Sequence, residues 1–320
     1  MRVLVTGATG FVGRCFVERA VRAPDTTVRA VVRGSVPPDE RRVEWVKLGE
    51  INAATRWAAA LKDVDVVVHL AGRAHVMRDV AGNPLDLYRE INVEGSLNLA
   101  RSAVAAGAKR LIFVSSVKVN GEGPPPGSAT LTGSPYRETD RPAPEDPYGI
   151  SKHEAEQRLG EIGAQSGLEL VVIRPPLVYG PGVRANMRSL IKAIAFGIPL
   201  PLAMVQNRRS LVYVENLVDF IWHCRDAPAA ANETFLVSDG EDLSTPDLIR
   251  RIAAAMGRPA RLLPVPAKLL WAGARLLCQE RRAQRLLGSL QVDITKARER
   301  LSWTPPICVD AALQQTVMRL

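Results

Sequence analysis

The first 21 residues combine an apolar strand, a glycine-rich turn and a helix, and few folds begin this way. Residues 2–6 are largely β-branched or apolar, Gly7-Ala-Thr-Gly10-Phe-Val-Gly13 follows, and we expect a helix to about Val21. Glycines at such a turn let the backbone approach a pyrophosphate, and the helix N-terminus offers N–H groups to its oxygens. The spacing is Gly-x-x-Gly-x-x-Gly instead of the common Gly-x-Gly-x-x-Gly. Even so, its place between strand and helix favours dinucleotide binding over a turn that serves packing alone.

Strands and helices continue to alternate after this unit. The further strands expected in the first half of the chain are residues 27–32, 46–51, 65–72 and 109–116. A long helix is expected over Tyr88–Ala106. Strands separated by helices of this length form a parallel sheet with helices on both faces. The predicted fold class is therefore α/β, with a Rossmann-type doubly wound parallel sheet and a smaller mixed α/β substrate lobe.

A second informative stretch is Asp146-Pro-Tyr-Gly-Ile-Ser-Lys152. Aspartate followed by proline is typical of a helix N-cap with proline at the first helical position. We expect a helix from Tyr148 to about Leu159 that ends near Gly160. Tyr148 and Lys152 then share one face, with roughly 5–6 Å between their Cβ atoms. Because a nearby ammonium lowers the pKa of a phenol, this pair can exchange a proton with a hydroxyl or carbonyl.

Ser115 and Ser116 end the expected strand 109–116, at the edge where ligands bind in such sheets. A loop rich in proline and glycine follows from Gly121 to Pro147 and is long enough to be a functional flap. A serine hydroxyl at a strand end and a Tyr/Lys helix form a coherent proton-transfer set. The predicted catalytic residues are Ser116, Tyr148 and Lys152.

The end of strand 27–32 bears on the cofactor. NAD-binding chains usually carry an acid there for the adenosine ribose, but this chain has Val32 and then Arg33. Without a carboxylate nothing repels a 2′-phosphate, and a guanidinium can bind it bidentately. We therefore expect NADP(H) in preference to NAD(H), although an Arg33 lying across the adenine would suit either. Glu50 is placed to accept a hydrogen bond from the adenine amine.

Composition excludes several classes of protein. The chain has 320 residues and a net charge of +9, but its arginines are dispersed and no aromatic-basic platform occurs, so we expect no nucleic-acid partner. Four scattered cysteines without a Cys-x-x-Cys pair or a histidine cluster indicate a reducing compartment and no metal site. Met1-Arg2 runs straight into the first strand, and no apolar run approaches ~20 residues. We expect a cytoplasmic protein without stable membrane insertion.

Other segments are open to more than one interpretation. His69 is expected to be structural, and His75 could contact substrate, although a surface role is preferred. Ser244 is expected to cap a helix with Asp247 as its partner. Lys268–Leu290 alternates leucine pairs with arginine and glutamine at helical spacing. This pattern fits a helix on a membrane surface, but an ordinary amphipathic helix is preferred.

Several motifs spread along the chain occur together in one enzyme family. They are Gly7-Ala-Thr-Gly10-Phe-Val-Gly13, His69-Leu-Ala-Gly72, Asn92-Val-Glu-Gly95, Ser115-Ser116, Tyr148-x-x-x-Lys152, Arg174-Pro-Pro-Leu-Val-Tyr-Gly-Pro181 and Arg209-Ser-Leu-Val-Tyr-Val-Glu-Asn-Leu217. On these motifs the chain resembles the extended short-chain dehydrogenase/reductases, in their NAD-dependent epimerase/dehydratase branch. We predict a dinucleotide-binding Rossmann domain over 1–175 and 205–240 and a nucleotide-sugar-binding lobe over 176–204 and 241–320.

The resemblance implies roles for matched positions. Ser116 hydrogen-bonds the reacting sugar oxygen, Tyr148 is the acid/base, and Lys152 holds the nicotinamide ribose and lowers the tyrosine pKa. The implied cofactor-binding residues are Gly7, Thr9, Gly10, Phe11, Val12, Arg33, Glu50, Ile51, Leu70, Ala71, Gly72, Asn92, Tyr148, Lys152 and Pro175. The implied substrate-binding residues are His75, Ser116, Val117, Lys118, Asn186, Leu200 and Arg209. The implied partners are a UDP-sugar and a second copy of the chain, through the helices of Asn92 and Tyr148.

Two departures from the family pattern bear on the reaction. The 4,6-dehydratases carry Asp and Glu directly after the catalytic Ser/Thr, but this chain has Val117 and Lys118. The acid expected at Val32 is also missing. We therefore expect hydride transfer at C4 of a UDP-sugar, preferably by a reductase of a UDP-4-keto-(6-deoxy)-N-acetylhexosamine in surface-polysaccharide precursor synthesis. The alternatives are a UDP-hexose or UDP-N-acetylhexosamine 4-epimerase with tightly bound NAD, and a non-catalytic cofactor-sensing regulator.

Overall fold

A parallel sheet forms the centre of the molecule. The structure is a computed structural model that describes residues 1–36, 42–74, 84–124 and 134–318. Seven strands in the described residues form this sheet, in the order β3-β2-β1-β4-β5-β6-β9. They are β1 (Arg2–Thr6), β2 (Thr27–Val32), β3 (Val43–Lys47), β4 (Val66–His69), β5 (Arg110–Val114), β6 (Glu169–Arg174) and β9 (Glu233–Leu236). The first six positions in this order are those of the doubly wound sheet that the sequence predicted.

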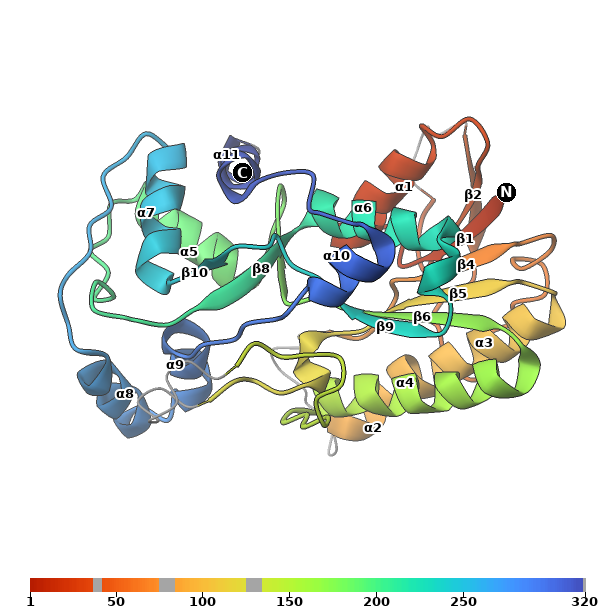
Figure 1. The fold of residues 1–320 in the computed structure, drawn as a ribbon, viewed down its shortest axis with the longest axis horizontal. Coiled ribbons are helices and arrows are strands. Elements are labelled where there is room, and N and C mark those ends of the chain that lie inside the picture. Colours follow the sequence, from red (N-terminus) through yellow and green to blue (C-terminus); the bar gives the residue numbers. More distant parts are fainter. Residues whose placement is uncertain (37–41, 75–83, 125–133, 319–320) are drawn as a thin grey trace.

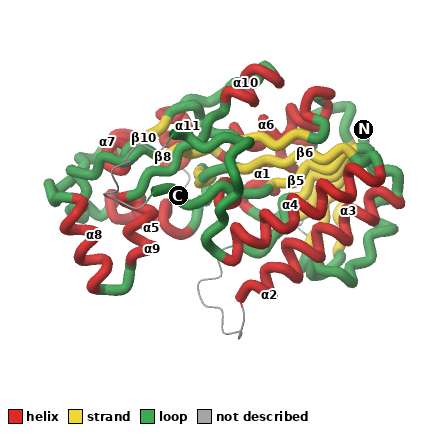
Figure 2. Tube along the Cα trace, turned by 60° about the horizontal axis from the view of Figure 1, so that its bottom comes forward, coloured by secondary structure: helices red, strands yellow, loops and turns green. Residues whose placement is uncertain are grey.

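Helices cover both faces of the sheet, as Figure 1 shows. On one face lie α1 (Phe11–Ala20) and α6 (Val214–Asp226). On the other lie α2 (Pro84–Tyr88), a π-helical turn, α3 (Gly95–Ala105) and α4 (Pro147–Ser166), the last two side by side in Figure 2. The strands that touch both layers are almost continuously apolar and fully buried, as expected for a parallel sheet covered on both faces.

A smaller sheet and further helices lie beside the main sheet, toward the left of Figure 1. In the described residues this sheet has the order β10-β8-β7. Its strands are β7 (Leu177–Tyr179), β8 (Arg209–Tyr213) and β10 (Asp242–Leu243). The helices of this part are α5 (Ala185–Ala195), α7 (Thr245–Ala255), α8 (Ala267–Leu276), α9 (Glu280–Leu287) and α11 (Val309–Met318). Helix α10 (Thr295–Leu301) packs instead on the main sheet, beside β9. Short 3₁₀ turns lie at Val117–Val119 and Pro228–Ala230. The division of the chain into two domains at the predicted boundaries stays a prediction.

Some expected elements are confirmed and others are shifted. Strand 27–32 is found as β2, and Ser244 caps α7 by accepting a hydrogen bond from the Asp247 N–H at 3.1 Å. The third strand, expected at 46–51, lies at Val43–Lys47, because it pairs with β2 in a register that ends at Val32 and Lys47. Just beyond it, Gly49 has a φ of +71°, which no extended strand accommodates.

Three expected helices differ from the prediction in length or continuity. The Tyr/Lys helix α4 continues through Gly160 to Ser166 and ends at Gly167, whose φ is +77°. The helix expected at 88–106 contains a π-helical turn at Arg89–Glu94. The segment 268–290 holds two helices, because Cys278 between them has a φ of +52°. Each difference depends on a backbone conformation that residue type alone does not determine.

Glycine is required by contact distances at the turn after β1. Gly7 has a φ of +67°, and a Cβ on Gly13 would lie 2.1 Å from the Gly7 carbonyl oxygen. The first turn of α1 therefore packs directly on the end of β1, where no side chain fits. Within the described parts of the chain, no helix combines the length and the apolar character that crossing a membrane requires.

This contact predicts a large difference between two glycine-to-alanine substitutions. We expect Gly13→Ala to lower the free energy of unfolding by about 2 kcal/mol or more, because backbone atoms must move to admit the methyl group. Gly160→Ala is the matched control, since it lies inside α4 with nothing within 4 Å of its Cβ position. This substitution should stabilise the protein by about 0.5–1 kcal/mol. Urea unfolding measures both, and equal effects would contradict the assignment of a steric role to Gly13.

Candidate active site

The candidate site lies at the carboxyl edge of the parallel sheet. The loops after β1, β4 and β5 carry Gly7, Gly72 and Ser116 respectively. Because the strands are parallel, these three loops meet at one edge of the sheet. Helix α4 brings Tyr148 and Lys152 to the same place, as the contacts below show.

The turn between β1 and α1 has the features of a diphosphate cradle. Gly10 is the N-cap of α1 and makes no side-chain cap, so the N–H groups of the first turn remain available to phosphate oxygens. Thr9 and Gly10 are exposed, and Phe11 and Val12 are half-buried. The backbones of Gly7, Gly10 and Gly13 lie so close together that a β-carbon at these positions would collide with a neighbour. Because all three are glycines, no side chain covers this surface. The residues present therefore fit a dinucleotide.

Buried hydrogen bonds hold the loop after β4 beside this cradle. The His69 ring lies 2.6 Å from the Thr6 Oγ1 and 2.8 Å from the Ser96 Oγ. Burial, and then the charge of Lys152, lower the pKa of His69 to about 3, so the ring is neutral. Thr6 also accepts from the Ala71 N–H at 3.2 Å. The expectation that His69 is structural is confirmed.

Asn92 joins the same loop to helix α4. Its carboxamide accepts from the Arg73 N–H at 2.7 Å and donates to the Ser151 Oγ at 3.0 Å. Ser151 in turn donates to the Tyr148 carbonyl at 2.8 Å. The π-helical turn places Asn92 in this position, and such turns are common at functional sites. The side chain of Asn92 thus orients the loop and the catalytic helix, and its contact with a cofactor stays a prediction.

Ser116, Tyr148 and Lys152, the three predicted catalytic residues, lie close to the end of β5. The Ser116 side chain lies close enough to the Tyr148 hydroxyl to affect the pKa of the phenol. The Lys152 Nζ donates to the Val114 carbonyl at 2.8 Å and lies 4.2 Å from the centre of the Phe113 ring. A Cβ on Gly72 would lie 3.6 Å from this Nζ, so the amine also faces the loop after β4.

Burial dominates the protonation of this pair. It raises the pKa of Tyr148, and the nearby Asp146 carboxylate raises it further, while the Ser116 side chain lowers it. Burial also lowers the pKa of Lys152 to about 8, against a smaller opposite effect of Glu156. The sequence predicted that Lys152 lowers the tyrosine pKa. That effect of Lys152 stays a prediction, because the net pKa of Tyr148 is governed by burial, which disfavours the phenolate.

Lys118 has a structural role that sequence reasoning missed. Its Nζ donates to Glu122 at 2.6 Å and forms an ion pair with Asp146, the N-cap of α4. The pKa of Asp146 is lowered overall. Burial alone would raise it, but the hydrogen bond and the charge of Lys118 outweigh that effect. Val117 is only 4% exposed, in an apolar cluster with Leu236 and others, so its side chain offers no surface to a substrate.

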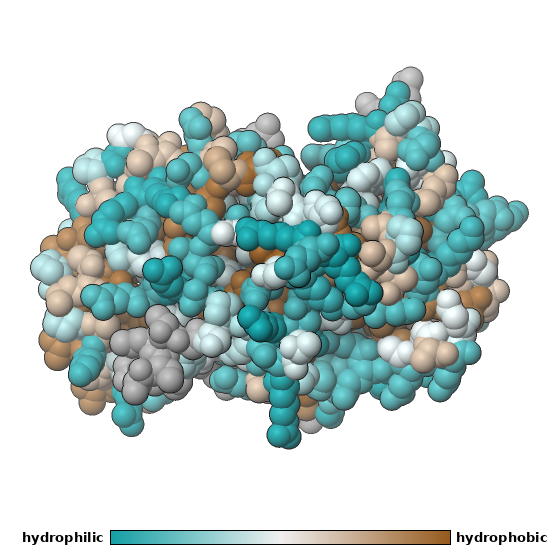
Figure 3. Space-filling model, viewed as in Figure 1, coloured by the Kyte–Doolittle hydropathy of each residue, from teal (hydrophilic) through white to brown (hydrophobic). Residues whose placement is uncertain are grey.

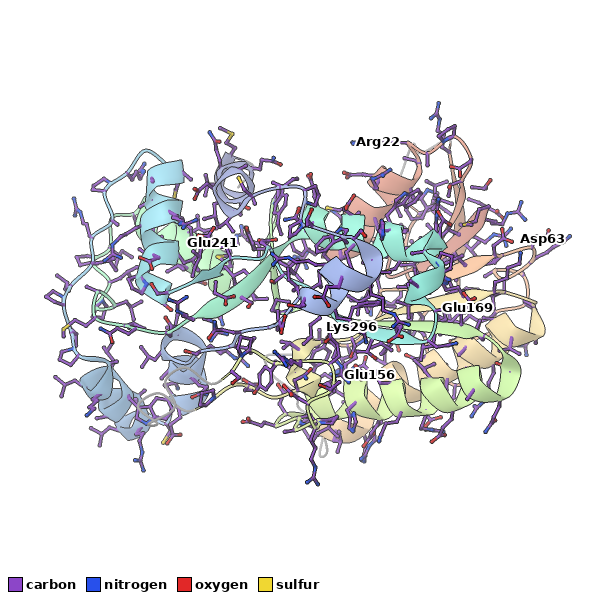
Figure 4. The ribbon with its side chains drawn as sticks, viewed as in Figure 1. Arg22, Asp63, Glu156, Glu169, Glu241 and Lys296 are labelled. Atoms are coloured by element: carbon purple, nitrogen blue, oxygen red, sulfur yellow. The ribbon has the colours of Figure 1, made fainter. Side chains whose placement is uncertain are left out.

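A buried ion pair between β6 and α4 also contacts the segment that follows β5. Arg174 on β6 donates to Glu156 on α4, with Nε 3.0 Å from Oε1, and to the Asn120 side chain at 3.1 Å. Figure 4 marks Glu156 on this helix. Glutamate eight residues after Tyr148 gives no sequence signal of its own, because its partner is on a distant strand.

Arg209 lies where β8 begins and is the candidate ligand for a substrate diphosphate. Its Nη1 donates to the Gly288 carbonyl at 2.9 Å. Burial lowers its pKa to about 10, the charge of Glu122 raises it and that of Arg285 lowers it. Arg209, Arg285 and the Lys118–Glu122 pair therefore share one region. A second arginine in this place is a further residue that the sequence analysis did not identify.

The remaining predicted residues lie at the expected ends of elements or outside the described residues. Arg33 and Glu50 are exposed, after β2 and β3, whereas Ile51 is buried at 6% exposure. Leu70 is half-buried, and the Pro175 carbonyl accepts from the Val117 N–H at 3.0 Å. Asn186 is exposed in the first turn of α5, and Leu200 forms a β-bridge with Leu262. His75 lies outside the described residues. The roles assigned to these side chains stay predictions.

The fold and the site define a nicotinamide-dependent enzyme of the extended short-chain dehydrogenase/reductase class. The model of the NAD dependent epimerase/dehydratase family matches residues 3–238. The chain therefore belongs to the NAD-dependent epimerase/dehydratase family.

Individual relatives agree with this assignment. The UDP-glucose 4-epimerase of Vibrio cholerae is 46% identical over 315 residues, which cover 98% of this chain and 94% of that protein. An N-acetyl-α-D-glucosaminyl-diphospho-ditrans,octacis-undecaprenol 4-epimerase of Escherichia coli O157:H7 is 28% identical over 332 residues, with the same coverage of 98% and 94%.

Solved structures show the same fold. The UDP-glucuronic acid 4-epimerase of Bacillus cereus in complex with NAD has a TM-score of 0.79 at 20% identity, covering 100% of this chain and 98% of that one. The UDP-glucose 4-epimerase of Thermotoga maritima with UDP-glucose has a TM-score of 0.77 at 24% identity and the same coverage. At these identities the likeness establishes the fold alone.

The buried amine of Lys152 predicts a pH dependence of stability. Its pKa falls from 10.5 to about 8 on folding, so between these values the unfolded chain binds more protons than the folded one. The free energy of unfolding therefore rises with pH there. Relative to Lys152→Met, we expect the wild type to gain up to about 3 kcal/mol as pH rises from 8 to 10.5. Urea unfolding across this range measures the gain.

Lys62→Met is the control for the loss of any lysine, since Lys62 is exposed. The difference between wild type and this variant should show little change over the same pH range. A difference for Lys152→Met that stays flat or falls with pH would contradict the burial of a charged amine at this position.

Proposed function

We propose that the protein is a UDP-hexose 4-epimerase that uses bound NAD. The observation that carries the proposal is the 46% identity to a UDP-glucose 4-epimerase along almost the full length of both chains. The arrangement of Ser116, Tyr148 and Lys152 at the sheet edge supports it, because a phenol and a hydroxyl lie together where a sugar hydroxyl can be deprotonated.

The residues of the chain have separate tasks in this reaction. Tyr148, as its phenolate, accepts the proton of the sugar 4-hydroxyl to become the phenol and later returns that proton, and Ser116 hydrogen-bonds the same sugar oxygen. Lys152, held by the Val114 carbonyl, supplies positive charge beside the phenolate. Gly7, Gly10 and the N-terminus of α1 would hold the dinucleotide diphosphate, and Arg209 would hold that of the substrate. When bound, the nicotinamide supplies the site that takes a hydride from C4 and gives it back.

The raised pKa of Tyr148 is compatible with this chemistry. A phenol that is protonated in the protein alone needs an added positive charge to act as a base near neutral pH. An oxidised nicotinamide would supply such a charge when bound. The acid/base strength of Tyr148 would then depend on the presence of the oxidised cofactor.

The reductase that the sequence analysis preferred is the second candidate. Arg33, exposed after β2 where an acid is usual, favours the 2′-phosphate of NADP(H) and hence an exchanging cofactor. The proposal departs from that preference because the relatives described above are epimerases, and two of the solved structures are described with NAD or a UDP-sugar. The name of the Escherichia coli relative describes a sugar joined through a diphosphate to undecaprenol. Such a lipid-linked sugar also carries a diphosphate next to the sugar, so it should be assayed beside the UDP-sugars and UDP-4-keto sugars.

The cofactor that remains in the purified protein separates the two candidates. An epimerase should release about one NAD per chain when the purified protein is denatured, and it should interconvert UDP-glucose and UDP-galactose without added cofactor. Protein that carries little nicotinamide and consumes NADPH with UDP-4-keto sugars would instead support the reductase. Chromatography of the released nucleotide and of the sugar products measures both. A homodimer through the helices of Asn92 and Tyr148 stays a prediction.

A single substitution tests the proton transfer. We expect Tyr148→Phe to lower turnover at least ~100-fold while cofactor binding is retained, because only the phenolic hydroxyl group is lost. Tyr213→Phe is the matched control, since its hydroxyl donates to Gln315 at 2.8 Å in another part of the fold. Turnover of the control should stay close to wild type. Unchanged turnover of Tyr148→Phe would remove the proposed mechanism.

A further inference from the structure

Helix α8 packs against the protein along one side and presents leucines to solvent along the other. Leu270, Trp271 and Ala274 are half-buried on the core around the small sheet. Leu269 and Leu276 are 64% and 87% exposed. At 100° per residue, positions 269, 272 and 276 fall within one narrow stripe, so Ala272 completes an outward apolar face.

The apolar surface continues past the helix. Leu277, in the linker to α9, is 73% exposed, and Leu286 on α9 is 41% exposed. Leu263, in the segment that leads into α8, is 49% exposed. Figure 3 shows hydrophobic surface at the left end of the molecule, where Figure 1 places α8. Exposed leucines gathered on one helix and the segments that flank it mark a surface suited to contact with something apolar.

Positive charge is concentrated in the same stretch of sequence. Residues 258–285 contain seven arginines and lysines and one acid, a net +6 of the +9 carried by the whole chain. The basic residues are Arg258, Arg261, Lys268, Arg275, Arg281, Arg282 and Arg285. Lys268 and Arg275 are exposed on α8, close in angle to the leucine stripe. The one acid within residues 258–285 is Glu280, whose Oε1 lies 3.9 Å from the Arg275 Nε.

We propose that α8 and its linker to α9 dock the protein on an anionic lipid bilayer. A stripe of leucine bordered by lysine and arginine is the pattern of a helix that lies in the membrane interface, where apolar side chains enter the acyl region and cations meet lipid phosphates. The ten residues of α8 extend about 15 Å, half the thickness of the hydrocarbon core, so the helix lies on the surface. A second copy of the chain is a poorer partner, because two-fold pairing would place like charges together.

The docking surface adjoins the residues that approach the substrate diphosphate. The Gln284 side chain on α9 donates to the Gly123 carbonyl at 3.1 Å. Asn207, two residues before Arg209, donates to the Leu286 and Gly288 carbonyls at 3.2 and 3.0 Å. Docking would therefore hold this side of the site near the lipid headgroups. The docking itself does not depend on which reaction the enzyme performs.

Vesicle sedimentation tests the proposal. We expect the full chain to bind vesicles of phosphatidylglycerol and phosphatidylethanolamine at physiological salt, and to bind phosphatidylcholine vesicles at least ~10-fold more weakly. Leu276→Ser/Leu277→Ser should weaken the anionic binding at least ~10-fold, and Lys268→Gln/Arg275→Gln should do the same. Neither pair is assigned to the reaction, so the conversion of UDP-sugars without lipid should be unchanged in both.

Matched controls lie elsewhere on the molecule. Met318→Ser removes another exposed apolar side chain, 70% exposed on α11. Arg22→Gln/Lys62→Gln removes two exposed charges near the opposite end of the molecule, where Figure 4 marks Arg22. Both controls should bind anionic vesicles as the wild type does.

The cysteines of the chain allow a second readout. Cys278 is exposed in the linker after α8, and Cys308 is exposed just before α11. A solvent-sensitive fluorophore on Cys278, in a Cys15→Ala/Cys308→Ser background, should shift to shorter wavelength when anionic vesicles are added. The same fluorophore on Cys308, in a Cys15→Ala/Cys278→Ser background, should not shift.

Three results would overturn the proposal. The first is no binding of the wild type to anionic vesicles, and the second is equal loss of binding in the α8 variants and their controls. The third is a change of oligomeric state in Leu276→Ser/Leu277→Ser by light scattering with vesicle binding unchanged, which would assign the stripe to a protein contact. A protein that shows no epimerase activity but still binds vesicles through α8 would contradict the proposed reaction. It would not contradict the proposed membrane docking.

Discussion

The bond from Lys152 to the Val114 carbonyl is the contact on which the site depends. It ties α4, the helix that carries Tyr148, to the end of a central strand, just before Ser116. Two further links prevent the helix from rotating about this point. Asn92 reaches it through Ser151 on one side, and Lys118 reaches its N-cap Asp146 on the other. A site held from three directions is preorganised, which is the condition for acid/base groups to act without costly rearrangement.

The sheet holds the site rigid, and burial determines the pKa values of the residues in it. Removing Tyr148 and Lys152 from water disfavours charge on both, so the pKa of the phenol rises and that of the amine falls. The protein alone thus keeps the phenol protonated near neutral pH, while the amine, with a pKa of about 8, remains largely charged there.

The sequence predicted those features that depend on local chemistry. The glycine turn, the β2 strand, the serines after β5 and the Asp146 cap all follow from residue type and spacing. The prediction failed where distant parts of the chain decide the outcome. Gly160 and Gly167 are equally good helix ends in the sequence, but only Gly167 adopts a positive φ. Lys118–Asp146 and Arg174–Glu156 join residues that have no periodic relation. The sign of the tyrosine shift required knowledge of burial, which spacing does not give.

The loop that precedes the catalytic helix is anchored by late residues of the chain. Tyr136 exchanges two backbone hydrogen bonds with the segment 291–293, and Asn120 donates to the Arg137 carbonyl beside it. Such contacts between distant positions form slowly and come last when a protein folds during synthesis. A nascent chain can therefore assemble its nucleotide cradle early. The bonds between Tyr136 and residues 291–293 can form only after residue 293 has left the ribosome, so the loop before α4 is completed late in synthesis.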